Sequence, residues 1–410
     1  MLIRSRVVLP ISQPAIENGA VAISGSQITA VGRWTDLASK TSVLDLGDSI
    51  VLPGLINAHC HLDYTSMAGQ IAAAKSFPDW IKAILALKAQ WGYTEYAQSW
   101  LAGTKMLLSR GVTSVADIEA VPELLPEVWT ATPLRVLSFL EMTGIKSQRP
   151  AAAILREAEA KILSLRSSKR DVGLSPHAPY STSPALLRLT GRTARRNNWR
   201  VTTHVAESAA EFEMFMYRRG PLFDWLKPQR DMNDCGHGSP VQHLARNHLL
   251  GPNALAVHVN YLWDNDAHLL GETGTHVVHC PRSHAYFGHQ RFPRLELSAQ
   301  GVNICLGTDS LASAKRERGE QLELDMFAEM RALAAKSSDL SSPEILQMAT
   351  LNGARALGLE GKLGELRAGS FADLIAIPFD GTGKDVYDAV LRHGGAVSAS
   401  MIDGKWVIAP

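Results

Sequence analysis

Cysteine is scarce in this sequence, and the few cysteines lie far apart. The 410 residues include only four of them, at positions 60, 235, 280 and 305, and no two form a Cys-x-x-Cys pair. Such spacing argues against a disulfide framework and against a zinc site built from thiolates. We therefore expect reduced thiols, as in a cytoplasmic protein.

Long apolar runs and an excess of one charge are also missing. No apolar run approaches the roughly 18 residues that a membrane span needs, and the first residues lack the pattern of a secretory leader. Lys and Arg number 41 against 40 Asp and Glu, which gives a net charge of +1 with the basic residues scattered. We expect a cytoplasmic protein with a small-molecule substrate and with neither nucleic acid nor membrane as a partner.

Several well-known catalytic signatures are absent too. The sequence has no His-Glu-x-x-His of the metalloproteases and no Pro-Cys-x-x-Cys of the cytidine-deaminase type. It also lacks a Gly-rich phosphate loop that ends in Gly-Lys-Ser/Thr. These absences turn attention to histidines and carboxylates placed elsewhere.

Both ends of the chain are rich in short strand patterns, and the middle is different. The N-terminal pattern predicts strands at 3–9, 19–23, 27–31 and 43–46, and the C-terminal pattern predicts them at 372–377, 396–401 and 405–408. Turns are expected at Ser24-Gly25-Ser26 and Asp403-Gly404. We predict one small β-sandwich domain built from residues 1–52 and 359–410.

Residues 53–358 alternate short apolar or β-branched runs with helical patterns. Eight strands are predicted, at 55–61, 113–117, 134–140, 171–176, 200–204, 254–258, 275–279 and 302–307. Helices are predicted at 79–90, 95–109, 151–165, 184–196, 320–335 and 343–357. Eight βα units in about 300 residues predict an α/β fold, a (β/α)8 TIM-type barrel with parallel strands.

Ionisable residues gather at the C-terminal ends of these strands, where barrels of this type carry their active sites. His59 and His61 end the first strand, and because side chains alternate along a strand they share one face. The later strands end in Glu141, His177, His204 with Glu207, His258, His279 and Asp309. We interpret His279 as a core residue, and His243, His248, His268 and His393 as surface residues. Cys235-Gly236-His237 lies in a Gly-rich loop, 212–238, that we expect to shape the pocket.

The order of the motifs resembles the amidohydrolase superfamily, in particular its zinc-dependent aminohydrolases of purine-like rings and nucleosides. The matching segments are 53–61 (Pro-Gly-Leu-Ile-Asn-Ala-His-Cys-His), 175–180, 204–207, 257–258, 279–283, 306–310 and 369–374. The resemblance implies that His59, His61, His204 and Asp309 hold one metal ion. It also implies that Glu207 and His258 are catalytic residues, and that the protein is a homodimer.

The residue types agree with this interpretation. Three imidazoles and one carboxylate suit zinc, with Fe²⁺ or Mn²⁺ as other possibilities, and a bound ion makes hydroxide available near neutral pH. Asp309 is expected to accept a proton from the water, His258 to orient the hydroxide, and Glu207 to protonate a ring nitrogen before ammonia leaves. A lysine that could bridge a second metal is missing from the fourth strand, since Lys169 precedes it. One metal ion is therefore predicted.

The substrate contacts are less sharply defined. His177 resembles a purine contact of the nucleoside aminohydrolases, Glu141 ends the neighbouring third strand, and Arg282 with His284 offers a surface suited to a carboxylate or aryl group. A structural salt bridge outside the pocket is the alternative for Arg282. Segments 77–80 and 307–313 resemble aminofutalosine deaminases, which favours 6-amino-6-deoxyfutalosine or another adenosine-like nucleoside. The alternatives are hydrolysis of another C–N or C–Cl bond, as in a triazine or a cyclic amide, and an inactive scaffold.

Overall fold

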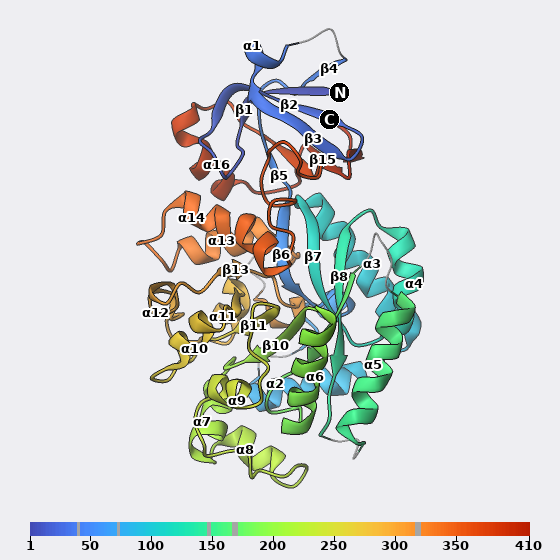
Figure 1. Ribbon diagram of the computed structural model, residues 1–410, viewed down its shortest axis with the longest axis vertical. Coiled ribbons are helices and arrows are strands. Elements are labelled where there is room, and N and C mark those ends of the chain that lie inside the picture. Colours follow the sequence, from blue (N-terminus) through green and yellow to red (C-terminus); the bar gives the residue numbers. More distant parts are fainter. Residues whose placement is uncertain (39–41, 72–73, 146–148, 166–170, 316–320) are drawn as a thin grey trace.

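Two sheets organise the molecule, which we describe from a computed structural model (Figure 1). The structure describes residues 1–410 apart from 39–41, 72–73, 146–148, 166–170 and 316–320. Lys169 is therefore outside the described residues. One sheet, here sheet A, carries both chain termini at the top of the view, and the other, sheet B, lies below it among most of the helices.

Sheet B is the barrel that the sequence predicts. Its eight parallel strands follow one another in chain order. They are β6 (Leu55–Cys60), β7 (Val112–Glu119), β8 (Arg135–Met142), β9 (Asp171–Pro176), β10 (Val201–Val205), β11 (Ala254–His258), β12 (His276–His279) and β13 (Ile304–Leu306). A parallel bridge between Cys60 and Asp309 brings the last strand back to the first. Each predicted strand overlaps an observed one, and the predicted fold is confirmed.

The closure of the barrel depends on a close approach of two backbones. A Cβ atom on Gly307 would lie 2.7 Å from the carbonyl oxygen of His59, a distance that real Cβ contacts do not reach. Asn57 fixes the same seam, because its Oδ1 accepts the Thr308 N–H (3.1 Å) while its Nδ2 donates to Thr308 Oγ1 (2.8 Å). This seam sets His59 and Asp309 side by side.

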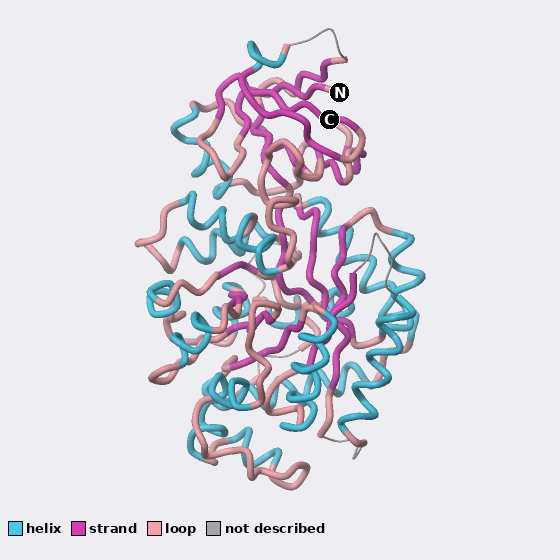
Figure 2. The backbone as a smooth tube through the Cα atoms, viewed as in Figure 1, coloured by secondary structure: helices cyan, strands magenta, loops and turns pink. Residues whose placement is uncertain are grey.

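Helices surround the barrel, most clearly on the side of β7 and β8 (Figures 1 and 2). The predicted helices correspond to α2 (Phe77–Lys88), α3 (Tyr93–Ser109), α5 (Ala151–Leu165), α6 (Pro184–Asn197), α13 (Met326–Ala334), α14 (Ser342–Met348) and α15 (Leu351–Ala356). The helix predicted at 343–357 is thus two helices, because Thr350 has a non-helical backbone (φ −136°, ψ −93°). Besides α7 and α8, treated below, the other described α-helices are α1 (Trp34–Leu37), α4 (Leu125–Val128), α9 (Pro240–Arg246), α10 (Asp266–Glu272), α11 (Pro281–Tyr286), α12 (Arg294–Ala299) and α16 (Val386–Arg392).

The segment predicted as a loop at 212–238 contains helical structure. Helix α7 (Ala209–Tyr217) enters it and α8 (Pro221–Leu226) lies within it. Arg218 and Gly220 have positive φ angles of 53° and 95°, which turn the chain sharply between the two helices. The apolar side chains of this segment pack with Phe77 and Tyr180 in a cluster of their own. Packing of this kind stabilises helices too short to form alone.

Sheet A joins the two ends of the chain. Its strands are β1 (Leu2–Val8), β2 (Ile16–Ser24), β3 (Gln27–Arg33), β4 (Val43–Asp45), β5 (Ser49–Pro53), β14 (Leu374–Pro378), β15 (Ala399–Ile402) and β16 (Lys405–Ile408). Strand β5, which the sequence shows only as an apolar run, pairs with β1 on one side and β14 on the other. The predicted turns occur, with φ of 58° at Gly25 and 55° at Asp403. The predicted domain boundaries stay a prediction.

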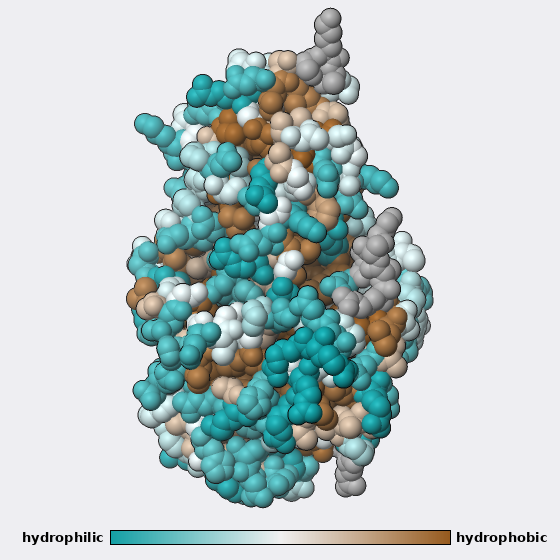
Figure 3. All heavy atoms as spheres, viewed as in Figure 1, coloured by the Kyte–Doolittle hydropathy of each residue, from teal (hydrophilic) through white to brown (hydrophobic). Residues whose placement is uncertain are grey.

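The surface is mixed in character. On the face seen in Figure 3, hydrophilic residues are widespread and hydrophobic residues form small areas among them. None of the described helices is both long and apolar enough to span a membrane.

Candidate metal centre and active site

Histidines from the first and fifth barrel strands meet in the centre of the barrel mouth. His59, on β6, has its ring centroid 5.0 Å from that of His61 and 4.9 Å from that of His204. Because β6 places His59 and His61 two residues apart, both reach the same side. Asp309 follows β13, and its Oδ1 lies 3.6 Å from His59 Nε2 and 3.7 Å from His61 Nε2. All four residues are buried.

The free donor atoms of this cluster fit a divalent metal ion. Neither ring nitrogen of His59 has a hydrogen-bond partner, which is unusual for a buried imidazole. Nε2 of His61 faces Nε2 of His204 at 3.3 Å. His204 Nδ1 lies 2.8 Å from the His177 carbonyl oxygen, so this nitrogen carries the proton and leaves Nε2 as a lone-pair donor. The ligand atoms of His59, His61 and Asp309 lie within 4.8 Å of one another.

Burial keeps His61 and His204 in the neutral state that a metal requires. It lowers the pKa of His61 to about 3, with the neighbouring His59 adding to the effect. The pKa of His204 is also well below its usual value, again because of burial first and adjacent imidazoles second. Three imidazoles and a carboxylate are a typical donor set for zinc.

Glu207 and His258 stand beside this cluster. His258 Nε2 lies 3.7 Å from Glu207 Oε1, and both side chains are buried. Burial raises the pKa of Glu207 well above its usual value, and the charges of Asp309 and Glu211 raise it further. A carboxyl group that keeps its proton near neutral pH is suited to act as a general acid.

Backbone strain marks the same strand ends. Positive φ angles occur at four residues: Ala206 (50°), His258 (77°), Val259 (49°) and Asp309 (55°). Ala206 follows β10, His258 ends β11 and Val259 follows it, and Asp309 lies after β13. Such angles cost free energy in residues with side chains and collect at functional sites. Here they aim Glu207, His258 and Asp309 at one point.

Two further residues hydrogen-bond to Asp309 and Glu207, and the sequence analysis predicted this contact for neither, although Ser313 ends the segment 307–313. Ser313 Oγ donates to Asp309 Oδ2 at 2.8 Å. Asn260 Nδ2 donates to the Glu207 carbonyl oxygen at 2.9 Å, and Asn260 Oδ1 lies 3.0 Å from His284 Nδ1. Serine and asparagine in loops are too common for their types alone to indicate such a role.

A pocket opens above the metal-binding cluster. Its polar lining includes His61, His177, His204, Glu207 and Asp309, and its apolar lining includes residues from α2 and α8. Glu141 and His177 line this pocket, as expected of substrate contacts, and their roles stay predictions. Other residues that line the pocket, for which the sequence predicted no role there, include Tyr64, Ile84 and Lys88.

Arg282 and His284 are engaged elsewhere and are not among the residues that line the pocket. Arg282 Nη1 donates to the Glu323 carbonyl oxygen at 2.8 Å and lies 3.8 Å from the buried Glu329 carboxylate. Of the two interpretations of Arg282, these contacts favour the structural ion pair. The contact of His284 with Asn260 places it behind Glu207.

The remaining histidines divide as follows. His279 stacks on Phe292 with centroids 3.9 Å apart, and it belongs to none of the metal-binding groups that the described residues form. His248 and His268 are exposed, as predicted, and His393 is half-buried. The prediction for His243 was wrong: it is 2% exposed and packs against Phe215, because α9 turns that face inward.

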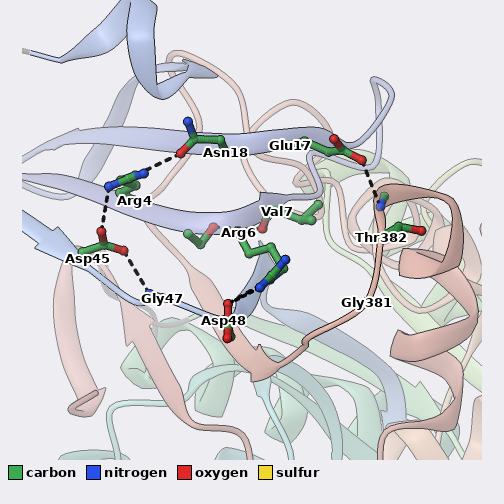
Figure 4. Close-up of a pocket in the computed structure, with 12 residues that line it drawn as sticks. Arg4, Arg6, Val7, Glu17, Asn18, Asp45, Gly47, Asp48, Gly381 and Thr382 are labelled. Atoms are coloured by element: carbon green, nitrogen blue, oxygen red, sulfur yellow. Dashed lines mark hydrogen bonds and ion pairs between the residues drawn. The ribbon is translucent and has the colours of Figure 1, made fainter.

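A second cavity lies in sheet A, away from the barrel mouth (Figure 4). Arg4 pairs with Asp45 at 3.0 Å and Arg6 with Asp48 at 2.5 Å. Glu17 Oε1 accepts the Gly383 N–H at 3.0 Å. Since each of these charged groups has a partner, their contacts serve to hold the strands together.

Comparisons with known proteins agree with the geometry. The model of the amidohydrolase family matches residues 50–407. A 5-methylthioadenosine/S-adenosylhomocysteine deaminase of Syntrophobacter fumaroxidans is 34% identical over 88% of this chain and 80% of its own length. An adenosine deaminase of Xanthomonas campestris with bound zinc has a TM-score of 0.86 at 25% identity, over 100% of this chain and 92% of that one. The aminofutalosine deaminase of Helicobacter pylori in complex with methylthio-coformycin has a TM-score of 0.86 at 21% identity, over 99% of this chain and 100% of that one.

Proposed function

The chain belongs to the amidohydrolase family, and we propose that it is a zinc-dependent deaminase of adenosine-like nucleosides. It is a hydrolase that acts on carbon–nitrogen bonds other than peptide bonds, as its relatives are named deaminases. The observation that carries the proposal is the placement of a protonated Glu207 next to neutral imidazoles and a carboxylate that fit one metal ion. A cytoplasmic location and a homodimer stay predictions.

The proposed ligands of the ion are His59, His61, His204 and Asp309. A bound zinc ion supplies hydroxide near neutral pH by lowering the pKa of water toward about 7. Asp309, whose Oδ2 accepts a hydrogen bond from Ser313, would take up the proton that the water gives up. His258 orients the attacking oxygen toward the purine carbon that carries the amino group.

Glu207 acts on the ring nitrogen next to that carbon. Its carboxyl group donates a proton to this nitrogen as the oxygen adds, which moves negative charge away from the ring. Asp309 then delivers its proton to the amino group, and the C–N bond breaks as the C–O double bond forms. Ammonia leaves, and the proton of the added hydroxyl returns to the Glu207 carboxylate, which restores the starting state. Asn260 fixes the Glu207 carbonyl oxygen, so the acid keeps its direction during these steps.

The best candidate substrate is 6-amino-6-deoxyfutalosine, with other adenosine-like nucleosides behind it. Support comes from the pocket, where Trp80 and Trp225 provide aromatic walls and His177 stands at the polar end. The fold of the Helicobacter pylori aminofutalosine deaminase covers 99% of this chain. Aromatic walls favour a flat substrate that carries a second ring.

The test is ammonia release from adenosine, methylthioadenosine, adenosylhomocysteine, guanine and aminodeoxyfutalosine by zinc-loaded protein. Turnover of a nucleoside supports the proposal. The nucleoside with the highest kcat/KM identifies which substituent on the sugar the enzyme prefers. Ammonia from none of them would contradict it. Chloride release from a chlorotriazine, or opening of a cyclic amide, would then identify the alternative hydrolase.

A further inference from the structure

One fully buried carboxyl group beside the active site takes no part in the mechanism. It belongs to Glu211, in the first turn of α7. No cation among the described residues lowers its pKa, and it belongs to none of the candidate metal-binding groups that these residues form. Burial of a carboxyl group costs free energy unless its oxygens find partners. The contacts of Glu211 therefore indicate what the group does.

The partner of Glu211 is the backbone of the catalytic acid. The Glu207 N–H donates to Glu211 Oε2 at 2.9 Å. The other oxygen, Oε1, has no hydrogen-bond partner among the described residues. Burial raises the pKa of Glu211 to about 8, and hydrogen bonds from the backbone of Glu207 and Ala206 offset only part of this rise. Near neutral pH the group is therefore mainly a neutral acid that accepts one hydrogen bond.

Capping of α7 does not account for this contact. Ser208 is the N-cap residue, and its Oγ accepts the Glu211 N–H at 3.2 Å. In a capping box, the glutamate three residues into the helix reaches back to the N–H of the N-cap residue itself. Here the Glu211 side chain bonds to the N–H one residue earlier, which is that of Glu207. The bond is thus made to the catalytic acid rather than to the cap.

Glu207 is held on its other side by the loop that follows β11. Its carbonyl oxygen accepts from Asn260 Nδ2 at 2.9 Å, and the Ala206 carbonyl oxygen accepts the Asn260 N–H at 3.0 Å. Ala206 has a φ of 50°, a conformation that persists only where the surroundings enforce it. Glu211 supplies the contact to the N–H, so the backbone of the acid is held from two elements.

The helix that carries Glu211 is itself fixed by packing. Met214 and Phe215 of α7 are fully buried, in one cluster with Phe77 and Tyr180. An acceptor on a well-packed element holds its partner more precisely than one on a free loop. Precision matters here, because a displacement of about 1 Å can reduce a catalysed rate by about 100-fold.

We infer that Glu211 is a positioning residue, which aims the Glu207 carboxyl group at the ring nitrogen by fixing the Glu207 N–H. This inference rests on the proposed function and adds a residue that acts through the acid rather than on the substrate. Glu211 is not among the residues that line the pocket, and it transfers no proton to the substrate.

The experiment measures kcat and KM in zinc-loaded wild type, E211Q and E211M, with the best nucleoside of the panel. E211M should lower kcat by roughly 10- to 100-fold and change KM by less than about threefold, because the acceptor is lost while the pocket lining is kept. E211Q keeps an oxygen that accepts the Glu207 N–H and should retain about half of the wild-type kcat or more. E213M removes a half-buried carboxylate from the same helix and is the matched control, with wild-type kcat expected.

A second measurement separates positioning of the acid from a general structural role. In E207Q the proton that Glu211 helps to aim is already missing. Adding E211M to E207Q should therefore lower kcat by less than about threefold more, since the two residues act as one unit. A further loss in E207Q as large as that in the wild type would overturn the inference.

The remaining outcomes keep the two claims apart. Wild-type kcat in E211M would overturn the inference and leave the proposed function standing, and so would equal losses in E211Q and E211M. No ammonia from any nucleoside with the wild type would overturn the proposed function, and the inference with it. Zinc content and the melting temperature show that each variant is folded, and E211A makes the same test if E211M does not fold.

Discussion

At the scale of single residues, the proposed mechanism depends most on the proton of Glu207. Burial keeps it protonated, and its neighbour His258 is neutral because burial lowers the pKa of His258 to about 3. Glu207→Gln keeps the shape but removes the transferable proton. We expect kcat to fall by about 10²- to 10⁴-fold with zinc content unchanged, as measured by ammonia release and elemental analysis. A variant with more than a tenth of the wild-type kcat would rule out this role.

Ser313 is a second residue whose substitution should change zinc binding. Its hydroxyl is the donor to Asp309 Oδ2, and groups that orient metal ligands commonly matter for affinity. Ser313→Ala should weaken zinc binding by about 10- to 100-fold, measured by competition with a chromophoric chelator. Ser298→Ala removes an exposed hydroxyl and should leave the affinity unchanged. Equal affinities in the two variants would show that Ser313 has no such role.

The metal-ligand candidates could be predicted from the sequence because strand periodicity and the βα order place them together. Strand alternation puts His59 and His61 on one side, and the rule that barrel sites lie at C-terminal strand ends adds His204 and Asp309 to a larger set of ionisable residues. The resemblance to the amidohydrolase superfamily selected the four ligands from that set. Asn260 and Ser313 could not be predicted, since their contacts depend on how loops fold over the barrel. The same reason explains why Arg282 turned toward Glu329 without any sign in its local sequence.

At the scale of elements, the seam between β13 and β6 leaves the least room for a larger side chain. A methyl group on Gly307 would meet the backbone of His59 at 2.7 Å, so Gly307→Ala must push the two strands apart. We expect the free energy of unfolding to fall by about 2 kcal/mol or more, together with weaker zinc binding. Gly394→Ala is the control, because nothing lies within 4 Å of its new Cβ atom. Denaturant unfolding measures the free energy of unfolding of both variants. Equal values for the two would contradict this account of how the barrel closes.

Elements were predictable where their own residues determine them. The barrel strands are runs of β-branched and apolar residues. Helices α2 and α6 follow Ser76 and Ser183, whose side chains cap the first turn. Helices α7 and α8 were missed because they are short and depend on packing against Phe77 and Tyr180. Strand β5 was missed because its partners, β1 and β14, come from opposite ends of the chain.

At the scale of the whole molecule, stability should depend on buried neutral histidines. Burial, with help from nearby arginines, lowers the pKa of His243 from 6.5 to about 3. Between these values the unfolded chain binds a proton that the folded protein does not, so the free energy of unfolding falls as the pH is lowered. His243→Gln should make this decline shallower by up to about 1.4 kcal/mol per pH unit.

The measurement is urea unfolding of the zinc-loaded protein between about pH 4 and 7. His248→Gln replaces an exposed histidine and should follow the wild-type curve. A wild-type slope in His243→Gln would mean that His243 titrates normally in the folded protein.

The central claim is that one metal ion, held by His59, His61, His204 and Asp309, makes this protein a nucleoside deaminase. The most direct measurement removes metal with a chelator, restores it by titration with zinc, and follows ammonia release from the best nucleoside of the panel. We predict that activity disappears with the metal and returns in proportion to zinc, with a break near one ion per chain. Full activity in metal-free protein, or activity that returns in His204→Ala at the same zinc concentration, would contradict the account.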